Sequence, residues 1–227
     1  MSETVAKKKI TDPIILSLFD HSTVMVQPWH KAGYECWCVD LQHPKGVQEK
    51  EPGLFQVGAD ILTWMPPLRQ IGMVFAFPPC TDLAVSGARW FKEKGLASLV
   101  GALSLVNRAV EIAEWSNAPY FIENPVSTIS TYWRKPDYTF DPNEYAGYLP
   151  EDERDNDAYT KRTCLWTGSG FIMPIPNAVD PVLGSKMHLL PPSDQRANLR
   201  SMTPRGFARA VYEANVDYVK ARLMSGK

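Results

Sequence analysis

Two residues of the sequence, Cys80 and Glu123, have the types and the settings of a nucleophile and a proton donor. Cys80 follows the run Phe-Ala-Phe-Pro-Pro, and Glu123 follows Tyr-Phe-Ile and precedes Asn124. A thiolate is a strong nucleophile that can also leave again, so it suits a reaction that passes through a temporary covalent adduct. A carboxyl buried at a strand end has its neutral form favoured, so it can hold or give a proton. The pair predicts covalent catalysis assisted by an acid; the alternative is that the cysteine is a small core residue.

Apolar runs indicate the elements that must position this pair. The runs typical of buried strands are 14–19, 34–40, 55–57, 71–77, 119–123 and 163–168. Residues 94–117 have apolar positions at helical spacing, and 28–32 suit a shorter helix that ends at Gly33. Strands that alternate with helices in this order predict an α/β, Rossmann-like fold, with a mainly parallel sheet and helices on both faces.

The chain length and the change in composition along the chain set the domain organisation. With 227 residues, the chain is long enough for one well-cored domain, so we expect a single domain over 1–227. Residues 126–200 are rich in Pro, Asp, Tyr and Trp and read as a loop-rich region. A closing helix is expected at about 203–223, after Pro204.

Four chemically capable side chains follow the predicted strands. Asp20 comes after the first strand, Asp40 after the second, and Cys80 and Glu123 after two later ones. Ligands of open parallel sheets bind beyond the carboxyl ends of the strands. We therefore expect the four to share one sheet edge, with Cys80 and Glu123 at a common cleft.

Composition narrows the classes of partner. The net charge of −1 argues against holding nucleic acid by general attraction, although residues 186–209 are locally basic and 141–157 are acidic. No uninterrupted apolar run approaches the roughly 18 residues of a membrane span, so no membrane partner is expected. Four scattered cysteines predict reduced thiols in a cytoplasm. Cys36 and Cys38 read as core thiols, and no metal is expected. The oligomeric state is left open.

Several motifs resemble one known family. The matching segments are FPPCTDLAVSG (77–87), FIENP (121–125), GADIL (58–62) and MTPRGFARAVYEAN (202–215). They are similar to the Pro-Pro-Cys loop, the Glu-Asn motif, the cofactor-rim motif and the closing helix of cytosine-C5 DNA methyltransferases, in particular of compact phage-type members. The likeness covers most of 14–125 and then patches to the end. It implies a methyltransferase fold and a cytoplasmic enzyme of a bacterial or phage-infected cell.

The resemblance implies a role for each residue around the thiol. Cys80 would attack C6 of cytosine, and Glu123 would hold or give a proton at N3, which makes C5 a nucleophile. Arg162 would complete the catalytic set. The residues implied to contact the substrate, which would be DNA or a cytosine nucleotide, are Pro79, Asn124 and Lys161. The segment TKRTCLW (160–166) lacks the family's arginine–x–arginine spacing, so Lys161 and Arg162 are carried over only loosely.

The resemblance also implies S-adenosylmethionine as the cofactor. The residues implied to bind it are Phe19, Asp20, Asp40, Asp60 and Pro78. The family has a glycine-rich turn after its first strand, whereas the turn here, DHSTVMVQPW (20–29), contains no glycine. Val24 and Met25 would narrow that space or exclude positive φ. The cofactor pocket is therefore expected to be reshaped, or the cofactor to bind weakly or not at all.

Size leaves two further hypotheses open. Only about 35 residues separate TCLWTG from MTPRG, too few for the target-recognition domain of DNA-specific members. The protein could then act on a free cytosine nucleotide or a single strand, with another one-carbon donor, or it could be a non-catalytic binding protein. If the base comes from a duplex it must flip out, at a cost of a few kcal/mol, and Trp90 and Phe91 could pack against it. The basic stretch 188–201 could bind phosphates or close onto 141–157.

Overall fold

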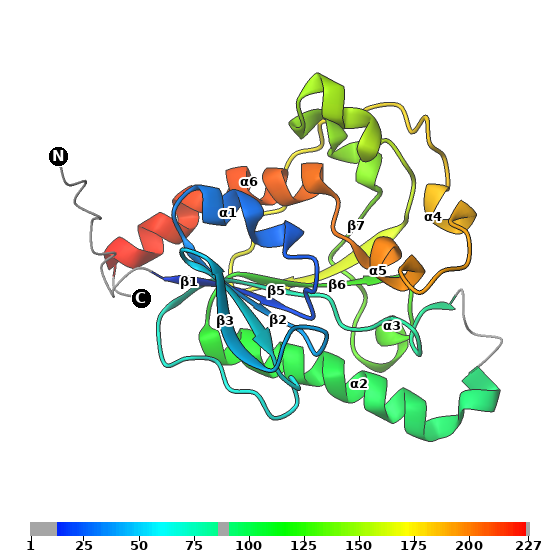
Figure 1. Ribbon diagram of the computed structural model, residues 1–227, viewed down its shortest axis with the longest axis horizontal. Helices are drawn as coiled ribbons and strands as arrows, with labels where there is room; N and C mark the ends of the chain where they lie inside the picture. Colours follow the sequence, from blue (N-terminus) through cyan, green and yellow to red (C-terminus); the bar gives the residue numbers. More distant parts are fainter. Residues whose placement is uncertain (1–12, 86–90, 226–227) are drawn as a thin grey trace.

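The computed structural model describes residues 13–85 and 91–225, with an eight-stranded sheet at its centre (Figure 1). Along the sheet the strands are ordered β3-β4-β2-β1-β5-β6-β8-β7. Their bounds are β1 Ile14–Leu18, β2 Glu35–Val39, β3 Gly46–Glu51, β4 Leu54–Gly58, β5 Ile71–Ala76, β6 Tyr120–Pro125, β7 Tyr138–Phe140 and β8 Thr163–Gly168. The strands expected from the apolar runs are all present.

The pairing is parallel in the middle of the sheet and antiparallel at both ends. Strands β4, β2, β1, β5 and β6 run parallel to one another. Strand β3 pairs antiparallel with β4 at one end, and β8 pairs antiparallel with both β6 and β7 at the other. The chain order reverses at β1, as in doubly wound sheets. The predicted Rossmann-like α/β fold is confirmed.

Helices cover both faces of the sheet and build two apolar cores (Figure 1). Helix α2 (Phe91–Ser116) lies on one face, where Val106, Ala109 and Ile112 pack against the strands. Helices α1 (Gln27–Lys31) and α6 (Arg205–Ser225) lie on the other, where Trp29 and Phe207 are fully buried. The sheet is therefore held rigidly between the two layers, and its carboxyl edge is a firm base for a site.

Helix α2 is the longest helix in the described part of the chain. Gly95 breaks its helical geometry with φ 74° near the start, a conformation that glycine adopts without steric cost. By length and composition alone, Lys92–Ser116 is long and apolar enough to cross a membrane, with a mean hydropathy of 1.4. Arg108 and Glu111 interrupt its apolar sequence. A helix that packs on a core passes the same test, and one face of α2 does so here.

The region 126–200 contains more regular structure than its composition indicates. It holds β7, β8 and three short α-helices: α3 (Ile129–Tyr132), α4 (Lys186–Leu189) and α5 (Arg196–Ser201). Three 3₁₀ helices, Pro142–Glu144, Ala146–Tyr148 and Glu151–Asn156, pack beside α6. Helix α6 begins at Arg205, two residues later than expected, and closes the fold over α1. Helix α5 is the element of this region that matters for the site.

Candidate functional site

The loop after β5 carries Cys80 and is pinned at both ends. The Cys80 carbonyl accepts hydrogen bonds from the Leu83 N–H at 3.0 Å and the Ala84 N–H at 2.8 Å, so the chain turns tightly after the cysteine. The Thr128 N–H in turn donates to the Leu83 carbonyl at 2.9 Å. The nucleophile loop is thus fastened to the segment that follows β6. Its half-buried thiol is held at the carboxyl edge of the sheet.

Asn124 ties this loop to β6 from inside the protein. Its side chain is fully buried, and its Nδ2 donates a hydrogen bond of 2.9 Å to the Pro78 carbonyl. Asn124 is adjacent to Glu123, so one amide sets the spacing between the nucleophile loop and the carboxyl. The family resemblance implies that Asn124 helps to fix the loop geometry and contacts the substrate; the hydrogen bond to Pro78 agrees with the first role, and the second stays a prediction. Pro78 is buried and Pro79 is exposed on the same turn.

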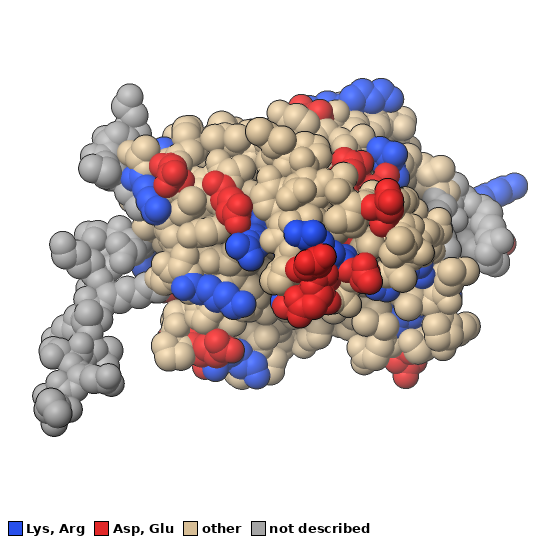
Figure 2. All heavy atoms as spheres, turned by 90° about the horizontal axis from the view of Figure 1, so that it is seen from above, with Lys and Arg blue, Asp and Glu red and all other residues tan. Residues whose placement is uncertain are grey.

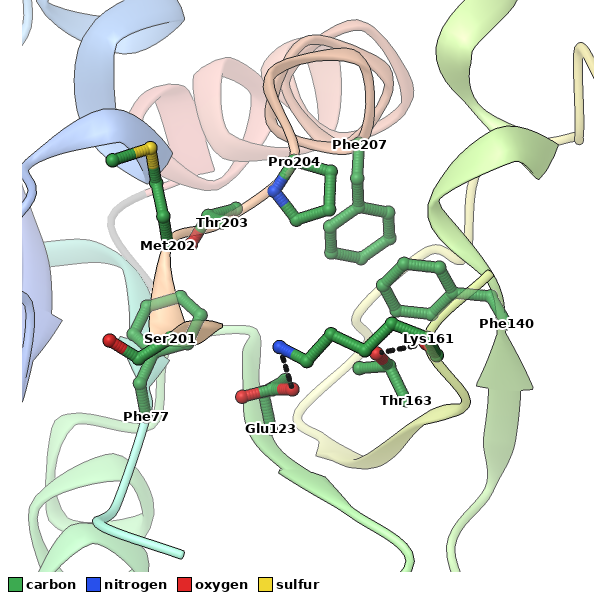
Figure 3. Close-up of a pocket in the computed structure, with 10 residues that line it drawn as sticks. All are labelled: Phe77, Glu123, Phe140, Lys161, Thr163, Ser201, Met202, Thr203, Pro204 and Phe207. Atoms are coloured by element: carbon green, nitrogen blue, oxygen red, sulfur yellow. Dashed lines mark hydrogen bonds and ion pairs between the residues drawn. The ribbon is translucent and has the colours of Figure 1, made fainter. Parts of the chain in front are cut away.

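Glu123 points into a small pocket with Lys161 beside it (Figure 3). Lys161 Nζ lies 4.0 Å from Glu123 Oε1, and only 15% of the Glu123 side chain is exposed. Glu123 Oε1 is buried and has no hydrogen-bond partner among the described residues. Burial raises the pKa of Glu123, and Lys161 partly offsets that rise. The carboxyl is therefore poised to keep or donate a proton into the pocket.

The thiol and the carboxyl lie within electrostatic reach of each other. Burial is the main cause that raises the Cys80 pKa, and the negative charge of Glu123 raises it further. Two cations, Lys161 and Arg200, act in the opposite direction and favour the thiolate. The charges of Glu123 and Lys161 both act on the Cys80 sulfur, so the three side chains lie near one another. The sequence analysis expected Cys80 and Glu123 at one cleft and gave Lys161 only a loose role as a substrate contact. Arg200 joins them from α5, a residue that the sequence analysis placed only in a basic stretch of undecided role.

The pocket is nearly closed by the chain that leads into α6. Residues 201–204 and Phe207 line it opposite Glu123, with Phe77 and Phe140 at its sides (Figure 3). Its cavity volume is about 10 Å³, roughly the minimum that holds one water molecule. The cytosine hypothesis requires room for a pyrimidine ring at Cys80 and Glu123, but the pocket at Glu123 is too small for one, and Cys80 is not among the residues that line it. A ring can enter this pocket only if residues that line it, such as 201–204, move.

Arg162 lies outside this cluster. Its guanidinium makes an ion pair of 3.0 Å with Asp141 Oδ2, and its side chain is 55% exposed. Both residues lie in the segment just before β8, where Lys161 Nζ is 4.0 Å from Glu123 Oε1 and Arg162 is paired with Asp141 instead. The expected catalytic role of Arg162 is not supported by this geometry. Lys161 is the cation at that place.

The carboxylate of Asp20, just after β1, makes its hydrogen bonds within its own turn. Its carboxylate accepts hydrogen bonds from Ser17 Oγ at 2.8 Å, Ser22 Oγ at 2.9 Å and the Thr23 N–H at 2.7 Å. The side chain is 3% exposed, and burial raises its pKa. The His43 ring nitrogen Nε2 lies 3.1 Å from the Asp20 carbonyl. Asp20 therefore organises the turn and does not present a free carboxylate to a cofactor.

Without glycine, the turn still adopts left-handed backbone. Phe19 has φ 57° and Thr23 has φ 60°, which is unusual for a β-branched residue such as Thr23. Met25 and Val26 are fully buried in the core beneath α1 and α6. Val24 and Met25 are not among the residues with positive φ, as expected; the left-handed angles of the turn fall on Phe19 and Thr23 instead, so the turn forms them without glycine. The apolar residues fill the core and not the space in front of β1.

The adenosine end of S-adenosylmethionine has suitable partners at the sheet edge. Asp40 uses Oδ1 to accept the Gln42 N–H at 2.7 Å, and its half-buried carboxylate keeps a second oxygen of the kind that binds a ribose diol. Asp60 is exposed and uses Oδ1 for the Leu62 N–H at 3.0 Å. The residues present thus fit an adenosine group at Asp40 and Asp60. They offer less at Asp20, where the methionine end would lie.

Helix α5 contacts both the loop beside Asp40 and the pocket of Glu123. Asn198 Nδ2 donates to Gln42 Oε1 at 3.0 Å, beside Asp40, while Ser201 at the other end of the helix lines the Glu123 pocket. The same short helix therefore covers the space between both halves of the candidate site. Trp90 lies outside the described residues, and so does the side chain of Phe91. In the described residues, no cluster of three or more His, Cys, Asp or Glu could hold a metal ion.

Charges around the molecule are mixed. Figure 2, viewed from the side that α1 and α6 cover, shows Lys and Arg side chains interspersed with Asp and Glu. The ion pairs Arg205–Glu153 at 2.7 Å and Arg209–Glu213 at 2.9 Å neutralise two of the basic residues on α6. Such a face gives little general attraction for a polyanion. Recognition of a substrate must then depend on contacts at the site itself.

The fold and site define a Rossmann-like α/β protein with a thiol and a carboxyl at the carboxyl edge of its sheet. No protein-family model and no curated protein matches the chain. Among solved structures, it is similar to the glycopeptide N-methyltransferase MtfA, with 13% sequence identity and a TM-score of 0.28. The match covers 68% of this chain and 64% of that one, so the chain spans less than two thirds of the length of that structure.

Proposed function

We propose that this protein is a cytosine-C5 methyltransferase that acts on DNA through a covalent adduct at Cys80. The observation that carries the proposal is the meeting of Cys80 and Glu123 at the carboxyl edge of the sheet, close enough for the charge of one to alter the pKa of the other. Lys161 completes the cluster 4.0 Å from the carboxyl. Cys80 lies in the loop after β5 and Glu123 lies in the neighbouring strand β6, so their proximity is a property of the fold.

The chemistry begins with the sulfur. Cytosine C5 is a poor nucleophile until a group adds to C6, and a thiolate is suited to that addition. Cys80 reacts as the thiolate, after its proton has passed to solvent. As the sulfur bonds to C6, the π pair of C5–C6 moves to C4–C5 and the π pair of C4–N3 moves to N3, which takes a proton from Glu123. The charges of Lys161 and Arg200 favour the thiolate. When a base later takes the C5 proton, the C5–C6 double bond re-forms and the sulfur leaves.

Glu123 would stabilise the negative charge that develops on the ring. Its raised pKa favours the protonated form, which can donate a hydrogen bond or a proton to N3 as electron density arrives there. Lys161 supports the ionised form once that proton has been given, because its ammonium lies 4.0 Å away. The pair can thus stabilise the adduct before and after proton transfer.

Asp40 and Asp60 are the residues that would hold S-adenosylmethionine, through its ribose hydroxyls and its adenine amine. When bound, the cofactor supplies an electrophilic methyl group for C5. Phe19 and Pro78 flank the space between Asp40 and the thiol loop, since they lie at the ends of neighbouring strands. Asp20 acts there only through the turn that it holds together.

The test is transfer of tritium from methyl-labelled S-adenosylmethionine to DNA. We expect transfer by the wild-type protein and a loss of about a thousandfold or more in Cys80→Ala, because the only route to an activated C5 is gone. Cys38→Ala is the matched control, since Cys38 is a fully buried thiol of β2. Transfer that survives in Cys80→Ala would contradict the covalent mechanism, and absence of transfer from the wild type would contradict the function.

A second candidate is the same chemistry on a free cytosine nucleotide or a single strand. One observation favours it: only the segment between Gly168 and Arg205 separates β8 from α6. A segment of this length does not suit a domain that recognises duplex DNA. Parallel assays of duplex DNA, single-stranded DNA and deoxycytidine monophosphate separate the two, and turnover of duplex DNA alone would remove the second candidate.

A further inference from the structure

Arg200 occupies an unusual position at the end of α5. The two residues that follow it, Ser201 and Met202, line the pocket of Glu123. Its side chain is half-buried, and no described residue makes an ion pair or a hydrogen bond with its guanidinium. The charge of Arg200 is felt at the Cys80 sulfur. A cation on the helix that leads into the Glu123 pocket is therefore near enough to the nucleophile for its charge to favour the thiolate.

Other arginines near this region are already neutralised. Each makes an ion pair with N–O distances between 2.7 and 3.0 Å: Arg162 with Asp141, Arg205 with Glu153 and Arg209 with Glu213. Arg200 differs from all three because it is more buried and has no acidic partner in the described structure. A guanidinium is always charged and presents a rigid fork of donors that matches phosphate. The structure leaves that fork available to an anionic ligand.

The reaction at Cys80 indicates which anionic group of the substrate would lie near Arg200. The thiol must approach C6 of the pyrimidine. In the common anti conformation of a pyrimidine nucleotide, C6 is the ring atom that lies nearest the 5′ oxygen of its own sugar. A phosphate on that oxygen is therefore beside the nucleophile whenever C6 is in reach. A cation whose charge acts on the Cys80 sulfur from α5 would then be within reach of this phosphate.

We propose that Arg200 binds the phosphate on the 5′ side of the target cytosine, so that the ligand of the site is a 5′-phosphorylated pyrimidine nucleotide unit. This assignment rests on the proposed function, because it needs C6 at Cys80. It gives α5 a role: phosphate binding by Arg200 places the covering residues 201–204 over a base that has entered. A free nucleoside lacks this anchor, whereas a mononucleotide and a residue within a strand both have it.

The experiment measures binding, which does not require turnover. A fluorescent single-stranded oligonucleotide with one cytosine is compared by anisotropy with the same strand carrying an uncharged methylphosphonate 5′ to that cytosine. We expect the wild-type protein to bind the methylphosphonate strand about tenfold more weakly, the effect of losing one charge-assisted hydrogen-bonded contact. Arg200→Ala should bind both strands equally weakly, and its slope of log affinity against log salt should fall by about one.

Two variants control the comparison. Arg209→Ala removes the same charge from an exposed, paired position on α6 and should keep the wild-type preference. Arg200→Lys keeps the charge but not the fork and should recover part of it. Calorimetry with deoxycytidine and its 5′-monophosphate shows whether a free nucleotide suffices: a preference for the monophosphate that Arg200→Ala abolishes assigns the site to mononucleotides as well as strands.

The outcomes separate this inference from the proposed function. Equal binding of both strands by the wild type, no measurable binding of either, or a preference that survives in Arg200→Ala would overturn the assignment of Arg200. Methyl transfer together with equal binding would overturn Arg200 alone. A phosphate preference that depends on Arg200, without any methyl transfer, would keep the phosphate contact and remove the proposed reaction. Thermal melting of each variant excludes unfolding as the cause.

Discussion

The two halves of the sheet edge are organised in opposite ways. At the ends of β5 and β6, contacts that are distant in sequence hold the site: Asn124 reaches the Pro78 carbonyl, and Thr128 reaches Leu83. At the end of β1, the turn is held mainly from within by Asp20, which accepts hydrogen bonds only from residues up to three positions away. The first half presents a thiol and a carboxyl to each other, and the second uses its carboxylate for its own backbone.

The difference indicates which side chains the fold holds at fixed positions relative to each other. Catalysis by a thiol and an acid requires two side chains from separate strands to keep a fixed distance, which long-range hydrogen bonds provide. A cofactor turn needs only a local shape, and here that shape includes left-handed backbone at Thr23. Changes at the β5–β6 half should therefore alter the chemistry strongly. Changes in the β1 turn should alter it weakly.

The largest expected effect is that of Glu123→Gln. The amide keeps the size of the side chain but has no proton to give at N3, so we expect methyl transfer to fall by about 10²–10⁴-fold. The loss should appear in kcat more than in KM, because the interaction grows as charge develops on the ring. Steady-state kinetics with labelled cofactor measures it. A loss below tenfold would mean that Glu123 is not the acid, and the β5–β6 half would lose its special status.

Asn124→Ala should be the next largest. It removes a buried hydrogen bond and leaves the Pro78 carbonyl unsatisfied, which costs about 1–3 kcal/mol of stability. Asn143 is a matched control, since its Nδ2 also donates to a backbone carbonyl, that of Val179 at 3.0 Å, but far from the thiol along the chain. Both variants should unfold at lower denaturant concentration. Only Asn124→Ala should also slow adduct formation at Cys80, and equal slowing by both would contradict its positioning role.

The raised pKa of Glu123 predicts a pH dependence of stability. The folded protein keeps this proton at pH values where the unfolded chain, with an ordinary pKa of 4.5, has lost it. The stability that the group contributes is complete below that value and is lost as the pH rises through the folded pKa. Glu123→Gln has no proton to lose. Its stability relative to the wild type should therefore increase from pH 5 to pH 8 in denaturant titrations, and a constant difference would contradict the raised pKa.

The smallest effect is expected from Thr23→Gly in the β1 turn. Glycine adopts φ 60° without steric cost but loses more freedom on folding, so the two terms nearly cancel and stability should change by less than about 1 kcal/mol. Methyl transfer should stay within about twofold of the wild type, a change too small to signal loss of a transition-state contact. A large loss of activity would show that the turn is as precise as the β5–β6 half, and the contrast between them would fail.

The sequence predicted the parallel part of the fold well because buried strands have continuous apolar runs. It missed β3, whose residues are all exposed and mostly polar or charged. It also missed β7, which has only three residues. It also could not show that β8 runs antiparallel between β6 and β7, since strand direction depends on tertiary pairing. Helix α5 was read as part of a proline-rich loop because six residues carry no helical periodicity.

The residues of the candidate site could also be predicted only in part. Cys80 and Glu123 were recognisable because each follows an apolar run; in the structure Cys80 lies in the loop after β5, and Glu123 lies within β6, two residues before its end. Lys161 and Arg162 are neighbours, and only the direction of each side chain shows that Lys161 faces the carboxyl while Arg162 pairs with Asp141. Arg200 carried no motif. Its importance comes from where α5 lies, which the sequence alone does not indicate.

The most direct test of the central claim is covalent trapping at Cys80. An oligonucleotide with 5-fluorocytosine at one position cannot lose fluorine from C5 as a proton would be lost, so an adduct formed after methyl transfer persists. Intact-protein mass spectrometry in the presence of S-adenosylmethionine should show the protein joined to one methylated strand, and peptide mapping should place the bond on Cys80. No adduct, or an adduct on one of the buried thiols Cys36, Cys38 or Cys164, would contradict the account.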